Sequence, residues 1–183
     1  YGGVDVLINN AGLSMRGPFS KVSEELARQL TEVNLVGSIV PTTAALEELK
    51  KSRGSVVFIS SAAGIRGFPN VSVYSATKMA LTGLAESLSA ELHASGVHCG
   101  VFYLGFTEND PDKEILDAEG RKITVERSWQ HTQQDAAAAI ARAIRRRKRR
   151  AVFTVPGKVL ALAERFVPGL LDRIVLRAKV HGE

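Results

Sequence analysis

The sequence is poor in cysteine and has no long apolar run. Cys99 is the single cysteine among 183 residues, which excludes an intramolecular disulfide and a cysteine-based zinc site and fits a reducing compartment such as the cytoplasm. No apolar run reaches the roughly 18 residues that a membrane-spanning helix needs. Hydrophobic residues nevertheless make up 45% of the chain. Composition therefore excludes intrinsic disorder and predicts a globular domain.

Acidic residues are missing from one segment, which accounts for the net charge of +5. Residues 142–150 (RAIRRRKRR) hold seven of the 24 basic residues and no acid. The remaining 17 basic residues stand against 19 acidic ones, so the rest of the chain carries −2. Such a segment could bind nucleic acid or anionic lipid, but it has no interleaved aromatic residues for base stacking. We favour a solvated helix end and expect no nucleic-acid partner.

Strand-like and helix-like patterns alternate along the chain. Short β-branched apolar runs predict strands, and longer stretches rich in Ala and Leu predict helices. The predicted strands are residues 4–8, 55–59, 97–104 and 151–154; the predicted helices are 24–51 with an interruption near Gly37, 74–93, 134–147, and 156–179 with a break at Pro168-Gly169. Residues 105–131 are polar and show little periodicity. This order predicts one α/β domain built on a parallel sheet.

Tyr74 and Lys78 are the first candidate pair for chemistry. On a helix, residues four apart share a face, so the Lys78 ammonium can approach the Tyr74 phenol. A neighbouring cation favours the phenolate and lowers the pKa of a tyrosine, as proton exchange near neutral pH requires. Taken alone the spacing is a weak signal, because a helix-start aromatic and a solvated lysine would produce it too.

Polar or small residues follow three of the predicted strands and strengthen the assignment. Asn9-Asn10-Ala11-Gly12 follows the first strand, Ser60-Ser61 the second and Gly105 the third. Each group alone is typical of a cap or turn. Open α/β sheets, however, build their sites at the carboxyl ends of the strands. Together with Tyr74 and Lys78, these residues predict one site at that edge of the sheet.

These residues resemble a known family. Asn9-Asn10-Ala11-Gly12, Asn34, Ser61, Tyr74 and Lys78, together with the phrases VDVLINNAG, SSAAG and VYSATKMAL, are similar in order and spacing to the short-chain dehydrogenase/reductase superfamily. The resemblance is strong over residues 1 to 107 and looser beyond. It implies a Rossmann-type doubly wound parallel sheet and an NAD(P)-dependent oxidoreductase that interconverts a carbonyl and an alcohol. It also implies a homodimer or homotetramer, with the helices at 24–50 and 74–93 at the interface.

The resemblance also implies roles for single residues. Tyr74 would be the general acid/base, and Lys78 would lower the pKa of Tyr74 and bind the nicotinamide ribose. Ser61 would hold the substrate oxygen, and Asn34 would anchor a water that links Lys78 to solvent. The residues expected along the cofactor cleft are Asn10, Ala11, Gly12, Gly105 and Thr107.

Two departures from the family pattern affect what we expect. The family has Pro-Gly where this chain has Leu104-Gly105, and the chain lacks the glycine-rich Thr-Gly-x-x-x-Gly-x-Gly turn that binds pyrophosphate. It also shows no early residue that selects NADP or NAD. In the family these features precede the strand at residues 4–8, so we expect the first βαβ units to be absent and Tyr1 to be a truncation point. A truncated or degenerate, non-catalytic binding module is therefore one alternative, and a peripheral membrane- or RNA-associating protein that acts through the basic C-terminal tail is the other.

The remaining segments carry weaker expectations. We divide the domain into a catalytic core (1–107), a substrate loop (108–132) in which Trp129 and His131 border the pocket, and a helical tail (133–183). Apolar residues recur in the tail at helical spacing. We favour ordinary packing or capping of the pocket for them, but contact with a membrane surface beside the basic segment stays open. The four histidines lack ligand spacing, so no metal is expected, and Cys99 in mid-strand predicts a small core residue.

Overall fold

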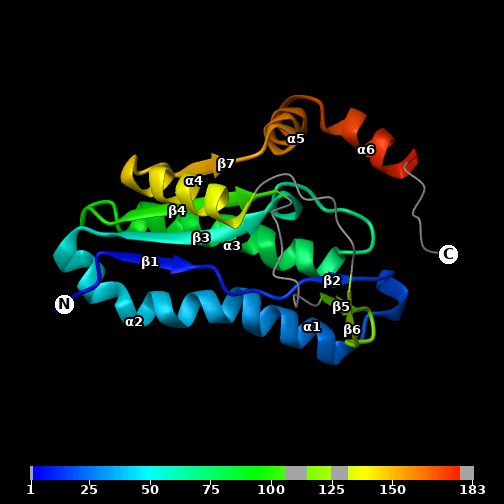
Figure 1. Cartoon of the computed structure of the whole chain (residues 1–183), viewed down its shortest axis with the longest axis horizontal. Coiled ribbons are helices and arrows are strands. Elements are labelled where there is room, and N and C mark those ends of the chain that lie inside the picture. Colours follow the sequence, from blue (N-terminus) through cyan, green and yellow to red (C-terminus); the bar gives the residue numbers. More distant parts are fainter. Residues whose placement is uncertain (1, 106–114, 125–131, 178–183) are drawn as a thin grey trace.

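A four-stranded parallel sheet forms the centre of the computed structural model, which describes residues 2–105, 115–124 and 132–177 (Figure 1). The strands lie in the order β1-β3-β4-β7, and every neighbouring pair is parallel. Their bounds are β1 Val6–Asn9, β3 Ser55–Ser61, β4 His98–Leu104 and β7 Arg150–Val152. Each crossover between parallel strands contains at least one helix, as this pairing requires. The prediction of an α/β domain on a parallel sheet is confirmed.

Helices pack on both faces of the sheet (Figure 1). The helices of the described ranges are α1 Glu24–Thr31, α2 Gly37–Ser52, α3 Ser72–Glu91, α4 Gln133–Arg145, α5 Val155–Phe166 and α6 Pro168–Arg177, of which α5 and α6 extend beyond the sheet. Because side chains alternate along a strand, Val56 and Phe58 pack in one cluster with residues of α2 and α3, while Val57 and Ile59 pack with residues of α4. Cys99 lies in the first cluster, and burial raises the pKa of its thiol to about 11, so its prediction as a core residue is confirmed.

Helices α1 and α2 are joined by a π-helical turn, Glu32–Val36. The interruption predicted near Gly37 is this turn. Ser23 begins α1 by accepting a hydrogen bond from the Leu26 N–H at 3.1 Å. A π turn widens the helix by one residue and is frequently found at functional sites. Here it contains Asn34, whose side chain is fully buried.

A second, smaller sheet lies beyond the carboxyl end of β1. It consists of β2 Met15–Arg16, β5 Ile115–Asp117 and β6 Lys122–Ile123, with β2 and β5 parallel and β5 and β6 antiparallel. The expectation that residues 105–131 are irregular is wrong at β5 and β6. Strands of two or three residues are too short to show a period of two, so the pattern could not reveal them. Met15 and Leu116 pack against Leu26 and Leu30 of α1.

Strand β1 is less buried than its apolar sequence predicts. Val6 is 45% exposed and Ile8 is 44% exposed, whereas Leu7 packs into the core beside α2. The pleat points Val6 and Ile8 to the face on which α4 lies. In the described part of the chain α4 packs over β3 and β4, so that face of β1 stays open.

A chain of buried polar side chains connects β1 to the π turn. Asn9 Nδ2 donates to Thr42 Oγ1 at 2.9 Å, and Thr42 Oγ1 donates to the Ser38 carbonyl at 2.7 Å. Ser38 Oγ donates to the Asn34 carbonyl at 3.0 Å. The Asn34 amide then holds Leu13, accepting from its N–H at 2.7 Å and donating to its carbonyl at 3.0 Å. These bonds fix the loop after β1 against the helix, because buried polar groups are costly unless paired.

In the basic segment 142–150, Arg147 has a structural role. Arg142 and Arg145 lie in the last turn of α4, as expected for a helix end. Arg147 has a left-handed backbone (φ 47°), and its guanidinium donates to the carbonyls of Arg53 (3.1 Å), Gly54 (3.4 Å) and Gly96 (2.6 Å). It thereby ties the α2–β3 and α3–β4 connections to the end of α4.

Replacing Asn34 tests the polar chain. Asn34→Ala should lower the free energy of unfolding by about 1 to 3 kcal/mol, because the N–H and carbonyl of Leu13 lose their partner. Urea denaturation followed by circular dichroism measures this change. Thr43→Ala is the matched control, because it removes an exposed side-chain bond to a helix carbonyl (3.1 Å) and should change stability by less than about 0.5 kcal/mol. Equal stability of the two variants would contradict the assigned role of Asn34.

Candidate active site

The carboxyl ends of the three strands β1, β3 and β4 meet at one edge of the sheet. Because the strands are parallel and adjacent, Asn9 ends β1 next to Phe58, and Ser61 ends β3 in register with Leu104. Gly105 follows directly after β4. The sequence analysis expects a site at this edge, and the register confirms that the strand ends gather there.

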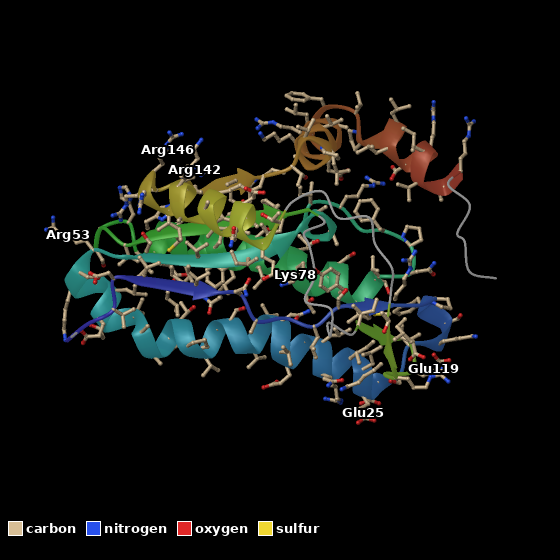
Figure 2. All side chains as sticks on the ribbon, viewed as in Figure 1. Glu25, Arg53, Lys78, Glu119, Arg142 and Arg146 are labelled. Atoms are coloured by element: carbon tan, nitrogen blue, oxygen red, sulfur yellow. The ribbon has the colours of Figure 1, made fainter. Side chains whose placement is uncertain are left out.

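Lys78 and Tyr74 lie one turn apart on α3. Lys78 Nζ is 5.9 Å from the centroid of the Tyr74 ring, and Lys78 is only 6% exposed, whereas Tyr74 is half-buried. The ammonium donates a hydrogen bond of 3.0 Å to the Ile59 carbonyl on β3 (Lys78 is labelled in Figure 2). A buried ammonium requires such partners. The predicted approach of the two side chains is present, and the bond to Ile59 holds the lysine in a defined place.

Ser60, near the end of β3, and Gly64, in the turn that follows, dock against the backbone of Lys78. The sequence indicated Ser60 only as one of the polar residues at the strand ends, and it indicated no role for Gly64. Ser60 Oγ donates to the Lys78 carbonyl at 2.9 Å. Gly64 packs so closely that a Cβ there would lie 2.8 Å from the same carbonyl oxygen. Only glycine permits this approach without a shift. Ser60 and Gly64 therefore hold the end of β3 against α3 at the position of the lysine.

Asn34 is connected to both residues of the candidate pair. Its Nδ2 donates to Thr77 Oγ1 at 3.0 Å, and Thr77 Oγ1 donates to the Tyr74 carbonyl at 2.8 Å. Gly12 lies between Asn34 and Lys78, because a Cβ at Gly12 would be 3.1 Å from both Asn34 Oδ1 and Lys78 Nζ. The structure thus brings Gly12, Asn34, Tyr74 and Lys78 together.

Ser61 begins a short 3-10 turn, Ala62–Gly64, at the same edge. Its Oγ accepts a hydrogen bond from the Ala63 N–H at 3.3 Å, and the residue is half-buried. The bond fixes the oxygen at the end of β3, at the edge of the sheet where Lys78 binds the neighbouring Ile59 carbonyl. A hydroxyl both accepts and donates hydrogen bonds, so it can bind a substrate oxygen as well.

The expected cofactor-lining residues have different surroundings. Asn10, Ala11 and Gly12 are exposed at the sheet edge. Gly105 has a packing reason to be glycine, because a Cβ there would lie 2.8 Å from Oγ1 of Thr154, the buried N-cap of α5. The other residues predicted near the site, Thr107, Trp129 and His131, lie outside the described residues.

Tyr103 is a structural tyrosine, and its surroundings differ from those of Tyr74. It is 5% exposed on β4, and its hydroxyl is 2.9 Å from Thr82 Oγ1. Burial raises the pKa of Tyr103, so this phenol stays protonated at neutral pH. Tyr74 instead has a half-buried ring beside an ammonium. A cation next to a phenol stabilises the phenolate, so the two tyrosines have different electrostatic surroundings.

Sequence reasoning missed several of the supporting residues. They are Ser38, Thr42, Gly64 and Thr77. One signal could have found the first two: Asn34, Ser38 and Thr42 recur every four residues, so they share one helix face. Gly64 and Thr77 show no comparable pattern, because Gly64 contacts Lys78 and Thr77 binds Asn34, and both partners are distant in sequence.

Comparison with known proteins agrees with this geometry. A sequence model of the family described as short chain dehydrogenase matches residues 1–120. The 3-dehydrosphinganine reductase of Danio rerio is 37% identical, over 62% of this chain and 36% of that protein. Human 17-beta-hydroxysteroid dehydrogenase type 1 is 38% identical, over 63% of this chain and 38% of that protein. Dehydrogenase/reductase SDR family member 7B of Bos taurus is 32% identical, over 96% of this chain and 55% of that protein. The chain thus spans 36% to 55% of the length of these relatives.

Solved structures give the same result. A short-chain dehydrogenase from Streptomyces avermitilis has a TM-score of 0.77 and 30% identity, and the match covers 95% of this chain and 67% of that one. The structure of ElxO with NADP bound has a TM-score of 0.57 and 30% identity, and the match covers 59% of this chain and 44% of that one. From the family match over residues 1–120 and these likenesses, we conclude that the chain belongs to the short-chain dehydrogenase family.

Proposed function

We propose that this chain carries the catalytic residues of an NAD(P)-dependent oxidoreductase that interconverts a carbonyl and an alcohol. The observation that carries the proposal is the buried Lys78 ammonium, bonded to the Ile59 carbonyl and 5.9 Å from the centre of the Tyr74 ring. A buried cation beside a half-buried phenol is an arrangement for proton transfer, since a fold gains little stability from a lysine in such a place.

The edge of the sheet beside Lys78 fits the nicotinamide end of a dinucleotide. Gly12 is exposed and presents bare backbone between Asn34 and Lys78, where a Cβ would fill the space. Asn10, Ala11 and Gly12 would line the cofactor, and the Lys78 ammonium would donate to a ribose hydroxyl. When bound, the dinucleotide supplies or accepts the hydride. The likeness to ElxO, which binds NADP, supports this assignment. NADP and NAD both suit these residues, because the two differ at the distant adenosine ribose.

The chain's own residues handle the proton and orient the substrate. In reduction, the Tyr74 hydroxyl donates its proton to the carbonyl oxygen, and in oxidation the phenolate accepts the proton of the alcohol. Lys78 stabilises the phenolate through its positive charge. Ser61 Oγ, fixed by its bond to the Ala63 N–H, donates a hydrogen bond to the substrate oxygen. Asn34 keeps the loop at Leu13 and the first turn of α3 in place around the pair.

The relatives suggest a ketone on a large apolar molecule as the substrate. The Danio rerio relative is a 3-dehydrosphinganine reductase and the human relative is a 17-beta-hydroxysteroid dehydrogenase. A sphingoid base and a steroid share a large apolar body. We therefore infer a substrate of this class for the present protein.

We also infer that the protein is a homo-oligomer through α2 and α3. Val40 is 59% exposed, Ile39 is 38% exposed and Met79 is 37% exposed on these helices. Apolar side chains that remain exposed on neighbouring helices support burial against a second copy. The homodimer or homotetramer implied by the family resemblance uses the same two helices.

Removing the Tyr74 hydroxyl tests the acid/base assignment. Tyr74→Phe, in the protein at its natural length, should reduce carbonyl reduction at least about 100-fold, because general acid catalysis contributes that much or more. The assay follows consumption of NAD(P)H with an apolar ketone. Tyr103→Phe is the matched control, since it removes the hydroxyl bonded to Thr82 away from the proposed proton path. An active Tyr74→Phe enzyme would overturn the mechanism.

Replacing Lys78 tests its electrostatic role through the pH profile. Alcohol oxidation needs the phenolate, so its rate should rise with pH through the pKa of Tyr74. Because a nearby cation lowers that pKa, Lys78→Met should move the rising limb to higher pH by about 1 unit or more. Lys51→Met, at an exposed lysine paired with Glu48 on α2, should leave the profile unchanged. If the rising limb of the pH profile lies at the same pH in Lys78→Met as in the wild type, Lys78 does not lower the pKa of Tyr74.

A further inference from the structure

Helices α5 and α6 carry an apolar surface that the described part of the chain leaves uncovered. On α5 the residues recur at positions 155, 159, 162 and 166, which places them on one face of the helix. We call these residues and two from α6 the tail stripe; it consists of Val155 (71% exposed), Val159 (60%), Leu162 (59%), Phe166 (70%), Leu170 (54%) and Ile174 (54%). Ordinary packing or capping of the pocket is the expectation from the sequence; the exposure of the tail stripe argues against packing on the described part of the chain, and capping of the pocket stays a prediction.

The acidic residues of these two helices are both held by one arginine. Arg66, in the loop after β3, donates to Glu164 of α5 at 2.6 Å and is ion-paired with Asp172 of α6. Its side chain is 13% exposed, and the two carboxylates raise its pKa. Arg66 thus fixes both helices to the body of the protein and neutralises the negative charge beside the tail stripe.

The charges that remain near the tail stripe are positive. Helices α5 and α6 contain four basic residues against the two paired acids; they are Lys158, Arg165, Arg173 and Arg177, all exposed. The Arg165 guanidinium lies over the Phe166 ring, 5.6 Å from its centroid. A long basic side chain next to an exposed aromatic ring can extend its charge above the apolar surface. The surface therefore combines apolar area with cations.

More positive charge lies on the same edge of the molecule. Arg142 and Arg146 of the basic segment point to the upper edge in Figure 2, the edge along which α5 and α6 lie. Both are exposed, and the segment 142–150 contains no acid. The edge thus carries α5 and α6, the helices of the tail stripe, at one end and exposed arginines at the other.

We propose that this edge docks on the surface of an anionic lipid bilayer, with the tail stripe in the headgroup region and the basic residues on the lipid phosphates. A bilayer surface offers an apolar interior and negatively charged headgroups together, and each Lys or Arg near it adds to the electrostatic attraction. A second copy of the chain would bring equally positive charge against this edge. A nucleic acid would pair its phosphates with the basic side chains but would leave the tail stripe exposed to water.

The proposed contact is peripheral. Among the helices of the described ranges, none is both long and apolar enough to cross a bilayer. Helices α5 and α6 have 12 and 10 residues, so they would lie in the plane of the interface. This lipid contact is independent of the proposed carbonyl–alcohol reaction, because the experiment below measures binding to vesicles and not enzyme turnover.

Sedimentation with lipid vesicles tests the docking surface. The whole chain should bind vesicles of phosphatidylcholine with about 30% phosphatidylserine, and binding should weaken in pure phosphatidylcholine and in about 0.5 M NaCl. Phe166→Glu should weaken binding at least about tenfold, since it places a charge in the tail stripe. Phe19→Glu is the matched control, because Phe19 is 72% exposed on a turn outside the tail and should leave binding unchanged.

Either of two results would overturn the proposal. The first is that the wild-type chain does not bind anionic vesicles. The second is that the Phe166→Glu and Phe19→Glu variants bind equally well while circular dichroism shows that both are folded. Sedimentation equilibrium tests whether a second copy of the chain, and not a bilayer, covers the tail stripe. If Phe166→Glu converts an oligomer into a smaller species and the wild-type chain ignores vesicles, the tail stripe is an interface between copies.

Discussion

A buried ammonium on α3 is the constraint on which the rest of the site depends. Lys78 is 6% exposed, and an unpaired charge in that place would cost several kcal/mol. The Ile59 carbonyl supplies a partner only because α3 lies directly on β3. Ser60 and Gly64 make that packing close, each at the carbonyl of the lysine itself. The position of Lys78 is therefore a consequence of how α3 and β3 pack, and Tyr74, one turn earlier on the same helix, is placed by the same contacts.

The polar side of the site depends on the π turn between α1 and α2. A regular helix would change the register of the residues that follow it, and Asn34 lies within the turn. From there Asn34 bonds Leu13 after β1 and Thr77 on α3. Ser38 and Thr42 continue the connection to Asn9 at the end of β1. One amide thus fixes two segments around the Tyr74–Lys78 pair, which explains why its burial is tolerated.

The sequence predicted what periodicity and local chemistry determine. The order of strands and helices follows from periodicity, the gathering of strand ends from the parallel sheet, and the approach of Lys78 to Tyr74 from their spacing of four on a helix. Contacts between distant residues cannot be predicted from periodicity. Gly105 has no room for a side chain because Thr154 lies against it. Ser60 donates a hydrogen bond to the carbonyl of Lys78, which is 18 residues away. The sequence also did not predict the exposure of Val6 and Ile8, because an apolar strand pattern does not indicate which faces of the strand other elements cover.

The loop after β3 connects the site to the tail, and this accounts for the orientation of the tail stripe. Within residues 60–66, Ser60 and Gly64 contact Lys78, whereas Arg66 reaches Glu164 and Asp172. An amphipathic helix normally turns its apolar face to the protein and its charges to water. Here Arg66 binds Glu164 and Asp172, whereas the apolar residues of the tail stripe remain exposed. The two ion pairs of Arg66, whose side chain is 13% exposed, thus hold α5 and α6 at the edge of the molecule that carries the basic segment, with the tail stripe exposed.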